Sequence, residues 1–192
     1  MIYYMVRFIV NIYISMYYKF EVVGIDKIPD SGSLIICSNH IHWADPVIVA
    51  CKSTTRQVHY LGKSELFKNN FISWFLKQLK VIPINRGKND VGAIKNSLRV
   101  LKDKKTLGIF PEGTRVSSKE EKKPEAGMAM LAIKSKATVI PIGLIGNYKF
   151  RSKILINIGE PILLDEYHDK KVNKEKLEEI SLEIMKEIKK LT

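Results

Sequence analysis

The sequence predicts a single α/β domain in which a mostly parallel sheet is flanked by helices. Seven short runs rich in Val and Ile have the length and flanking turn residues of strands. Helical patterns alternate with these runs, and such alternation is typical of parallel sheets covered by helices. With 192 residues, 45% of them hydrophobic and 27% charged, the chain can bury one sizeable core. No second domain boundary is visible.

In chain order, strands are expected at 20–23, 34–37, 58–61, 81–84, 107–110, 139–144 and 154–158. Asp45 and Pro46 have the pattern of an N-cap followed by proline at the first helical position, which predicts a helix through about residue 50. Apolar residues spaced three and four apart predict helices over 89–104 and 173–191. A further short helix is expected over 127–136.

The first 19 residues form an apolar, Tyr-rich segment, and we expect the domain itself to span 20–192. A helix over residues 2–18 would be roughly 25 Å long at ~1.5 Å per residue, slightly short of the ~30 Å hydrocarbon core of a bilayer. Tyrosine favours the interface between lipid and water. We therefore predict a membrane-associated N-terminal helix. The alternative is an amphipathic helix packed on the domain.

The net charge of +12 is unevenly distributed along the chain. Acidic residues slightly outnumber lysines in residues 165–192, so the positive excess lies in the rest of the protein. A basic surface attracts an anionic partner. Long Lys/Arg runs interleaved with aromatic residues are missing, so nucleic acid is not expected, and an anionic membrane surface is the predicted partner.

Two short motifs carry chemical information. In S-N-H-I-H-W-A-D-P at 38–46, four residues separate His40 from Asp45. Imidazole can accept a proton near neutral pH, and a carboxylate on its other nitrogen would fix its tautomer. The alternative is a structural histidine beside an N-cap aspartate. His42 is the weaker candidate for a base, and His59 lies in a predicted strand and is expected in the core.

In F-P-E-G-T-R at 110–115, Gly113 permits a tight turn and Arg115 offers a guanidinium that matches phosphate. Glu112 could orient Arg115 or bind a substrate hydroxyl. The alternative is a surface turn with a local ion pair. His40 and Glu112 both follow predicted strands and could share one edge of the sheet. A general base near an anion site indicates transfer chemistry on a phosphorylated substrate.

The same motifs resemble those of the glycerolipid acyltransferase family. N-H-x-x-x-x-D at 39–45 and F-P-E-G-T-R at 110–115 carry the resemblance, and I-P-I-N-R at 82–86 and V-I-P-I-G at 139–143 agree in type and order. The similarity runs almost continuously over 22–162. Within the family, the chain is most similar to members that acylate 1-acylglycerol-3-phosphate.

This resemblance implies a role for each matching residue. It makes His40 the catalytic base and Asp45 its partner. It places Arg86, Glu112, Gly113 and Arg115 at the phosphate of the acceptor.

Other positions match the family less closely. Lys63 is a possible third cation for the phosphate; its G-K-S context does not indicate a nucleotide site, because Gln57 replaces the first glycine of such a loop. Pro141 would belong to the wall near the acyl donor. Val116 stands where the family often has serine, and Ile84 lies where it often has an aromatic residue, so roles for such side chains are not carried over.

The implied reaction transfers a fatty acyl group from a thioester carrier to the sn-2 hydroxyl of 1-acylglycerol-3-phosphate (lysophosphatidic acid), giving phosphatidic acid. Acyl-CoA or acyl carrier protein would be the co-substrate, with no cofactor and no metal. We expect the protein at the cytoplasmic face of the cell membrane, peripheral or monotopic. The alternatives are another lysophospholipid or a lyso-aminolipid as acceptor, and a non-catalytic membrane lipid-binding module.

Overall fold

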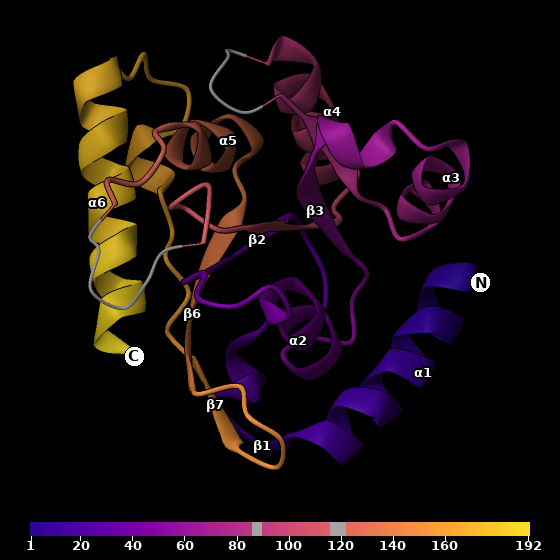
Figure 1. Ribbon diagram of the computed structural model, residues 1–192. Helices are drawn as coiled ribbons and strands as arrows, with labels where there is room; N and C mark the ends of the chain where they lie inside the picture. Colours follow the sequence, from indigo (N-terminus) through magenta and orange to yellow (C-terminus); the bar gives the residue numbers. More distant parts are fainter. Residues whose placement is uncertain (86–89, 116–121) are drawn as a thin grey trace.

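One seven-stranded sheet forms the centre of the computed structural model, which describes residues 1–85, 90–115 and 122–192 (Figure 1). The strands are β1 (Lys19–Val23), β2 (Leu34–Ser38), β3 (Val58–Lys63), β4 (Ile82–Ile84), β5 (Thr106–Ile109), β6 (Thr138–Gly146) and β7 (Lys153–Ile158). Their spatial order is β1-β7-β6-β2-β5-β3-β4. Each of the predicted strands is confirmed, to within two residues at either end.

Neighbouring strands run parallel except β6 and β7, which are antiparallel. The central strand β2 pairs with β5 on one side, Cys37 opposite Ile109, and with β6 on the other, Cys37 opposite Pro141. The carboxyl ends of β2, β5, β3 and β4 therefore meet at one edge of the sheet. In α/β proteins, sites gather at this edge.

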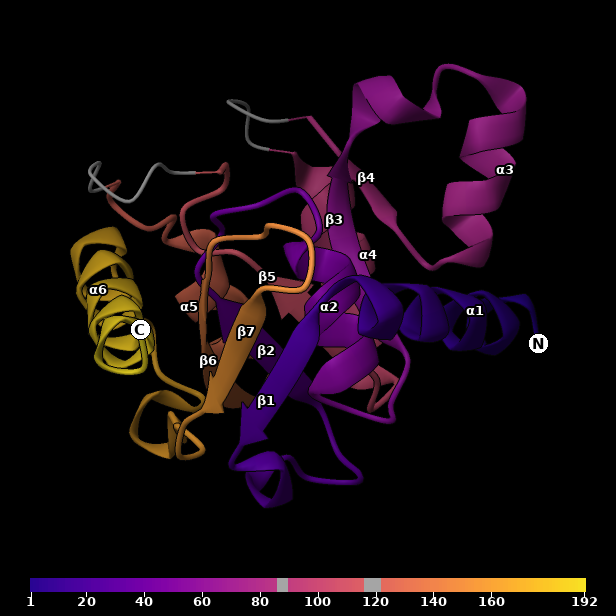
Figure 2. The same ribbon diagram turned by 60° about the horizontal axis from the view of Figure 1, so that its bottom comes forward.

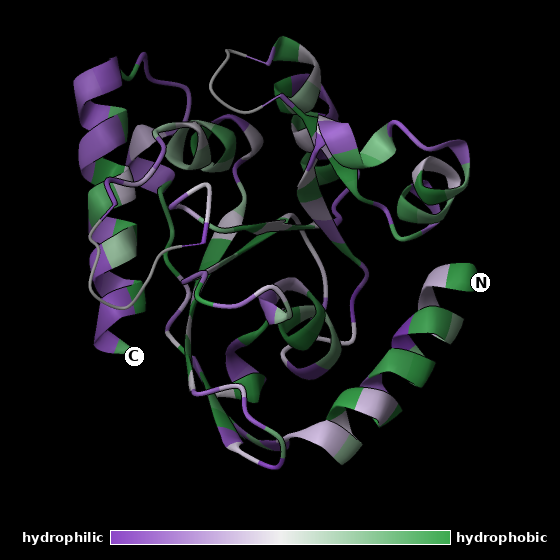
Figure 3. Ribbon diagram, in the orientation of Figure 1, coloured by the Kyte–Doolittle hydropathy of each residue, from purple (hydrophilic) through white to green (hydrophobic). Residues whose placement is uncertain are grey.

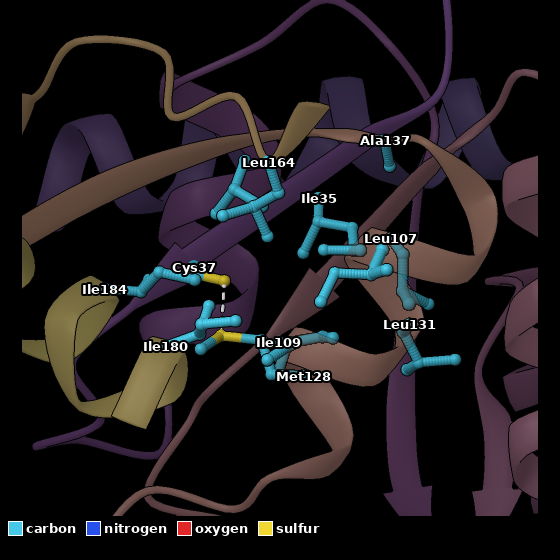
Figure 4. Close-up of a cluster of buried hydrophobic side chains, with 14 of the residues drawn as sticks. Ile35, Cys37, Leu107, Ile109, Met128, Leu131, Ala137, Leu164, Ile180 and Ile184 are labelled. Atoms are coloured by element: carbon cyan, nitrogen blue, oxygen red, sulfur yellow. Dashed lines mark hydrogen bonds between the residues drawn. The ribbon is translucent and has the colours of Figure 1, made fainter. Parts of the chain in front are cut away.

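Both faces of the sheet are buried, which explains why β2 reads as a continuous apolar run. Ile35 and Cys37 face a cluster formed with α4 (Val91–Lys102), α5 (Gly127–Ser135) and α6 (Lys174–Lys190). Figure 4 shows this cluster, including the contact between Cys37 Sγ and Met128 Sδ. Leu34 and Ile36 face the opposite cluster, formed with α1 (Ile2–Tyr17) and α2 (Asp45–Lys52). Helices thus cover the two faces (Figure 2).

The helices expected from periodicity are confirmed, and two local features differ from expectation. Ala44, not Asp45, occupies the N-cap position of α2, and Asp45 is the first helical residue. Asp45 is not a cap because its carboxylate turns back to residues that precede the helix. An additional helix, α3 (Asn70–Gln78), begins where the Asn69 side chain accepts hydrogen bonds from the next backbone N–H groups.

Helix α1 packs on the domain through one face only. Tyr3 and Ile14 are buried, and the Arg7 guanidinium donates to the carbonyls of Thr54 and Thr55 just beyond the end of α2. The opposite face exposes a continuous series of apolar side chains: Tyr4, Met5, Phe8, Ile9, Ile12, Tyr13 and Met16. Figure 3 shows the hydrophobic character of this helix. No helix in the described part of the chain is both long and apolar enough to cross a membrane.

Candidate active site

The segment that follows β2 carries the candidate base, and a buried amide fixes this segment. The side chain of Asn39 donates to the carbonyl of Leu144 at 2.9 Å and accepts from its N–H at 2.7 Å. Two hydrogen bonds to one residue of β6 hold the carboxyl end of β2 in place. His40 follows at once, at the edge where the parallel strands end.

His40 and Asp45 form the predicted pair. Nδ1 of His40 lies 3.0 Å from Oδ2 of Asp45, which is fully buried. The same oxygen accepts the N–H groups of Ile41 and His42, each at 2.7 Å. Because a carboxylate can only accept, Nδ1 of His40 carries the proton in this contact, and Nε2 has the free lone pair of a base.

The second carboxylate oxygen of Asp45 has its own donor. The Tyr148 hydroxyl, in the loop after β6, lies 2.6 Å from Oδ1. The Tyr148 ring also stacks on His42 at 4.2 Å between centroids. Asp45 thus receives four donors, which hold a buried carboxylate in one orientation. Tyr148 was not predicted from the sequence, because no local pattern connects it to a residue 103 positions away.

Aromatic stacking orients the imidazole ring of His40. The ring stacks on Phe110 at 4.2 Å, and Phe110 stacks in turn on Tyr60. Gly108 makes room for this column, since a Cβ there would lie 2.2 Å from the Tyr60 ring. Phe110 begins the F-P-E-G-T-R motif, so its position in the sequence was visible but its contact with the base was not.

Glu112 reaches the base by a contact that the sequence did not predict. Its Oε2 accepts a hydrogen bond of 2.8 Å from the backbone N–H of His40, and the side chain is buried. Burial raises the pKa of this carboxyl, and the His40 N–H opposes that effect. The expected proximity of His40 and Glu112 at one sheet edge is therefore observed, and Glu112 holds the backbone of the candidate base.

His40 lines a cavity of about 770 Å³ at the carboxyl edge of the sheet. Apolar side chains from β5, α4 and α5 line part of it, among them Ile94, Ile109, Met128 and Leu131. Polar residues line the rest, and both charges are present: the cations Lys63, Lys122 and Lys174 and the acidic residues Glu65, Asp90 and Glu125, with Asn85 and Thr114. Such a cavity can take a molecule with an apolar chain and an anionic end. Lys122 and Lys174 were not predicted, because surface lysines lack a distinguishing local pattern.

The predicted phosphate residues lie at different distances from this cavity. Lys63 and Gly113 line it, and Gly113 has a φ of +67°, a conformation that favours glycine. Arg115 is exposed, and its charge acts on His42. The described structure shows no ion pair between Glu112 and Arg115. Arg86 falls in 86–89, outside the described residues.

Pro141 lies inside β6 and is buried. Its carbonyl accepts from the N–H of Gly159 at 2.9 Å. It does not line the cavity around His40. The structure therefore gives this residue a place in the sheet, and does not bring it together with the other predicted site residues.

Two other histidines, His42 and His59, differ from His40 in their surroundings. His59 is buried in β3, as predicted, with Nδ1 3.1 Å from the carbonyl of Thr106. Burial lowers the pKa of His59. Burial also lowers the pKa of His42, and the positive charge of Arg115 acts in the same direction. His42 Nδ1 accepts from the N–H of Ala44, so this imidazole has a structural contact of its own.

Known proteins of one family are similar to this chain. A family model described as Acyltransferase matches residues 19–145. A 1-acyl-sn-glycerol-3-phosphate acyltransferase of Bacillus subtilis is 33% identical over 138 residues, which are 69% of this chain and 68% of that protein. One from Streptococcus pneumoniae is 30% identical over 173 residues, 86% of this chain and 63% of that protein.

A solved structure shares the fold. The crystal structure of the 1-acyl-sn-glycerophosphate (LPA) acyltransferase PlsC from Thermotoga maritima has a TM-score of 0.71 at 21% identity, and the match covers 92% of this chain and 72% of that one. The family model spans well over half of the chain and includes both predicted motifs. The chain therefore belongs to the acyltransferase family, as the resemblance of its motifs predicts.

Proposed function

We propose that this protein transfers a fatty acyl group from a thioester to the sn-2 hydroxyl of 1-acylglycerol-3-phosphate, giving phosphatidic acid. The observation that carries the proposal is the His40–Asp45 contact of 3.0 Å beside a cavity with an apolar wall and a polar part that contains three lysines and three acidic residues. The relatives from Bacillus subtilis and Streptococcus pneumoniae are named for this activity. No separate observation favours a different acceptor.

His40 acts as the base in the proposed reaction. Nε2 takes the proton of the acceptor hydroxyl while Asp45 stabilises the imidazolium through Nδ1. The hydroxyl oxygen then bonds to the thioester carbonyl carbon, giving a tetrahedral oxyanion. When this intermediate collapses, the C–S bond breaks and the leaving thiolate takes the proton from His40. The acceptor itself is the nucleophile, so no acyl-enzyme is needed.

Cations near His40 would hold the acceptor phosphate. Lys63 lines the cavity, Arg115 is exposed and directly follows the lining residue Thr114 in the chain, and the resemblance adds Arg86. Gly113 would let the backbone approach the phosphate, and Glu112 supports the site through the His40 backbone. The apolar wall formed by α4 and α5 suits a fatty acyl chain. Pro141 has no part in this proposal because it lies outside the cavity.

The lipid substrates point to a membrane as the place of reaction. We infer that the exposed apolar face of α1 rests in the interface of the bilayer at the cytoplasmic side, as a peripheral attachment. Arg7 and Tyr3 would keep the other face of this helix on the domain.

An assay of acceptors and donors tests the proposed function. The purified protein would receive acyl-CoA or acyl carrier protein thioester together with 1-acylglycerol-3-phosphate, another lysophospholipid or a lyso-aminolipid, and products would be followed by mass spectrometry. We expect phosphatidic acid as the main product with at least one donor. A preference for an acceptor without the phosphate monoester would contradict the proposed substrate, and the absence of any acyl product would favour a lipid-binding module.

A further inference from the structure

Helix α3 stands apart from the packed core. It lies between β3 and β4, joined to β3 by the short helical turn Ser64–Phe67, and none of its side chains is buried. The two strands that carry it end beside the cavity, since Lys63 and Ile84 both line that cavity. The helix therefore connects, along the chain, two strands that end at the candidate active site, and it is not part of the core.

Its exposed surface is apolar and aromatic. Phe71 is 73% exposed and Trp74 is 50% exposed, and Ile72 and Leu66 are exposed as well. The rings of Phe71 and Trp74 lie side by side, with centroids 6.1 Å apart. A contiguous apolar patch of this kind on a folded protein marks an interaction surface.

Lysines flank the aromatic pair in the sequence. Lys68, Lys77 and Lys80 are exposed, and none of the three forms a salt bridge within the described part of the chain. Glu65 is the acidic residue of the segment 63–84. Aromatic side chains favour the interfacial zone of a bilayer, and lysines close to it are attracted to anionic lipid. An anionic phospholipid surface therefore matches both features of this patch.

Helix α3 lies on the same side of the molecule as α1, which is compatible with contact to the same bilayer (Figures 1 and 2). Helices α1 and α3 lie at the same flank of the molecule in both views, and each has hydrophobic residues along much of its length (Figures 1, 2 and 3). The face of α1 proposed to rest on the membrane is exposed. One bilayer could thus contact both helices.

We propose that α3 is a second membrane-contacting element, and that Phe71 and Trp74 enter the headgroup region of an anionic bilayer. The proposal rests on the membrane attachment described under the proposed function and adds a separate point of contact. By anchoring the connection between β3 and β4, this contact places the wall that contains Lys63 and Ile84 next to the lipid surface from which the acceptor comes.

Tryptophan fluorescence tests this contact without any measurement of activity. The chain has two tryptophans, so Trp43→Phe leaves Trp74 as the single reporter. With vesicles containing phosphatidylglycerol, we expect its emission to shift to the blue and to be quenched by lipids that carry a quencher near the headgroup. Unchanged, unquenched emission from protein that floats with the vesicles would overturn the proposal and leave α1 as the attachment.

A matched pair of variants measures the contribution of the patch to binding. Phe71→Ser with Trp74→Ser should weaken partitioning into these vesicles by about tenfold or more, the scale expected for two aromatic side chains returned to water. Leu163→Ser, at a comparably exposed leucine between β7 and α6, should bind as the unmodified protein does. Equal binding by both variants would contradict a role for α3.

A second copy of the chain is the other possible occupant of the patch. In that case the unmodified protein will be a dimer in lipid-free solution and the double variant a monomer, and this result also overturns the proposal.

Acyl transfer to a short-chain, water-soluble acceptor separates this proposal from the proposed function. The double variant should retain that activity while its vesicle binding is weakened. If the fluorescence test shows that α3 does not contact the vesicles but the unmodified protein transfers acyl groups, the proposed function stands without the α3 contact. If the unmodified protein does not transfer acyl groups, the proposed function is refuted and the fluorescence result for α3 remains valid.

Discussion

The Tyr148 hydroxyl donates a hydrogen bond of 2.6 Å to Oδ1 of Asp45, the carboxylate oxygen that does not contact His40. Tyr148 has a φ of +55° and stacks on His42, so both backbone and ring hold the hydroxyl in position. Burial, and after it the negative charge of Asp45, raises the pKa of Tyr148, which keeps this hydroxyl protonated as a donor. We therefore propose that Tyr148 is a positioning residue that acts on the candidate base His40 through Asp45.

Tyr148→Phe should lower kcat for acyl transfer by about tenfold, the scale of one lost hydrogen bond to a buried charge. The ring would stay, but Oδ1 would lose its donor and the carboxylate would be less well oriented toward His40. Steady-state kinetics with a saturating acceptor measure the change. Tyr18→Phe is a matched control, because Tyr18 is also a buried ring next to Tyr148 and its hydroxyl has no hydrogen bond among the described residues.

A double-mutant cycle distinguishes positioning through Asp45 from a general effect on stability. In an Asp45→Asn background, Tyr148→Phe should have much less effect on kcat than in the unmodified protein, because the two changes act on one contact. If the two losses multiply, Tyr148 acts independently of Asp45.

Arg115→Ala should lower kcat/KM for 1-acylglycerol-3-phosphate by an amount equivalent to about 1.5–3 kcal/mol of transition-state stabilisation, the range for a lost hydrogen bond to a charged group. Arg115→Lys should recover only part of this, because an ammonium replaces the planar fork. The same assay with an acceptor that lacks phosphate should show little change. Arg99→Ala, an exposed arginine of α4 that does not line the cavity, is the control. An equal fractional loss on both acceptors would mean that Arg115 does not bind phosphate.

His59 should make stability depend on pH in the acidic range. Burial lowers its pKa below the ordinary 6.5, so the unfolded chain binds more protons between the folded pKa and 6.5. The contribution of His59 is therefore fully present above about pH 6.5 and is lost as the pH falls. His59→Gln keeps an amide that can donate to Thr106 but cannot titrate. Urea unfolding at about pH 5.5 and 7.5 should show a smaller loss of stability on acidification in the variant than in the unmodified protein. Parallel losses would show that His59 does not contribute.

The sequence predicted those parts of the fold that face the core. The strand β2 is covered on both faces and has almost no polar residue, and α4 and α6 each turn one apolar stripe to the sheet. Helix α3 was not predicted, although its apolar residues Ile72, Phe75 and Leu76 have helical spacing; none of its side chains is buried. Asn69 was a further signal, as an N-cap residue in front of that helix.

The candidate site was predictable where its contacts are local. His40 and Asp45 lie within one turn of the chain, so their spacing was enough to predict their contact. The parallel order of β2 and β5 brings Glu112 close, but the sequence could not show that its partner is a backbone N–H. Tyr148 and Lys174 reach the site from distant loops and helices, and such contacts depend on the packing of the whole sheet.

Turnover by His40→Ala is the most direct test of the proposed role of the His40–Asp45 pair. In purified, folded protein with a thioester donor and 1-acylglycerol-3-phosphate, we expect kcat to fall by about 10²–10⁴, the usual contribution of a general base. Asp45→Asn should lose less, because it keeps the shape but not the charge. Circular dichroism and unchanged vesicle binding would confirm that the variant is folded and attached. Phosphatidic acid formation by folded His40→Ala at near the unmodified rate would contradict the assignment of His40 as the base.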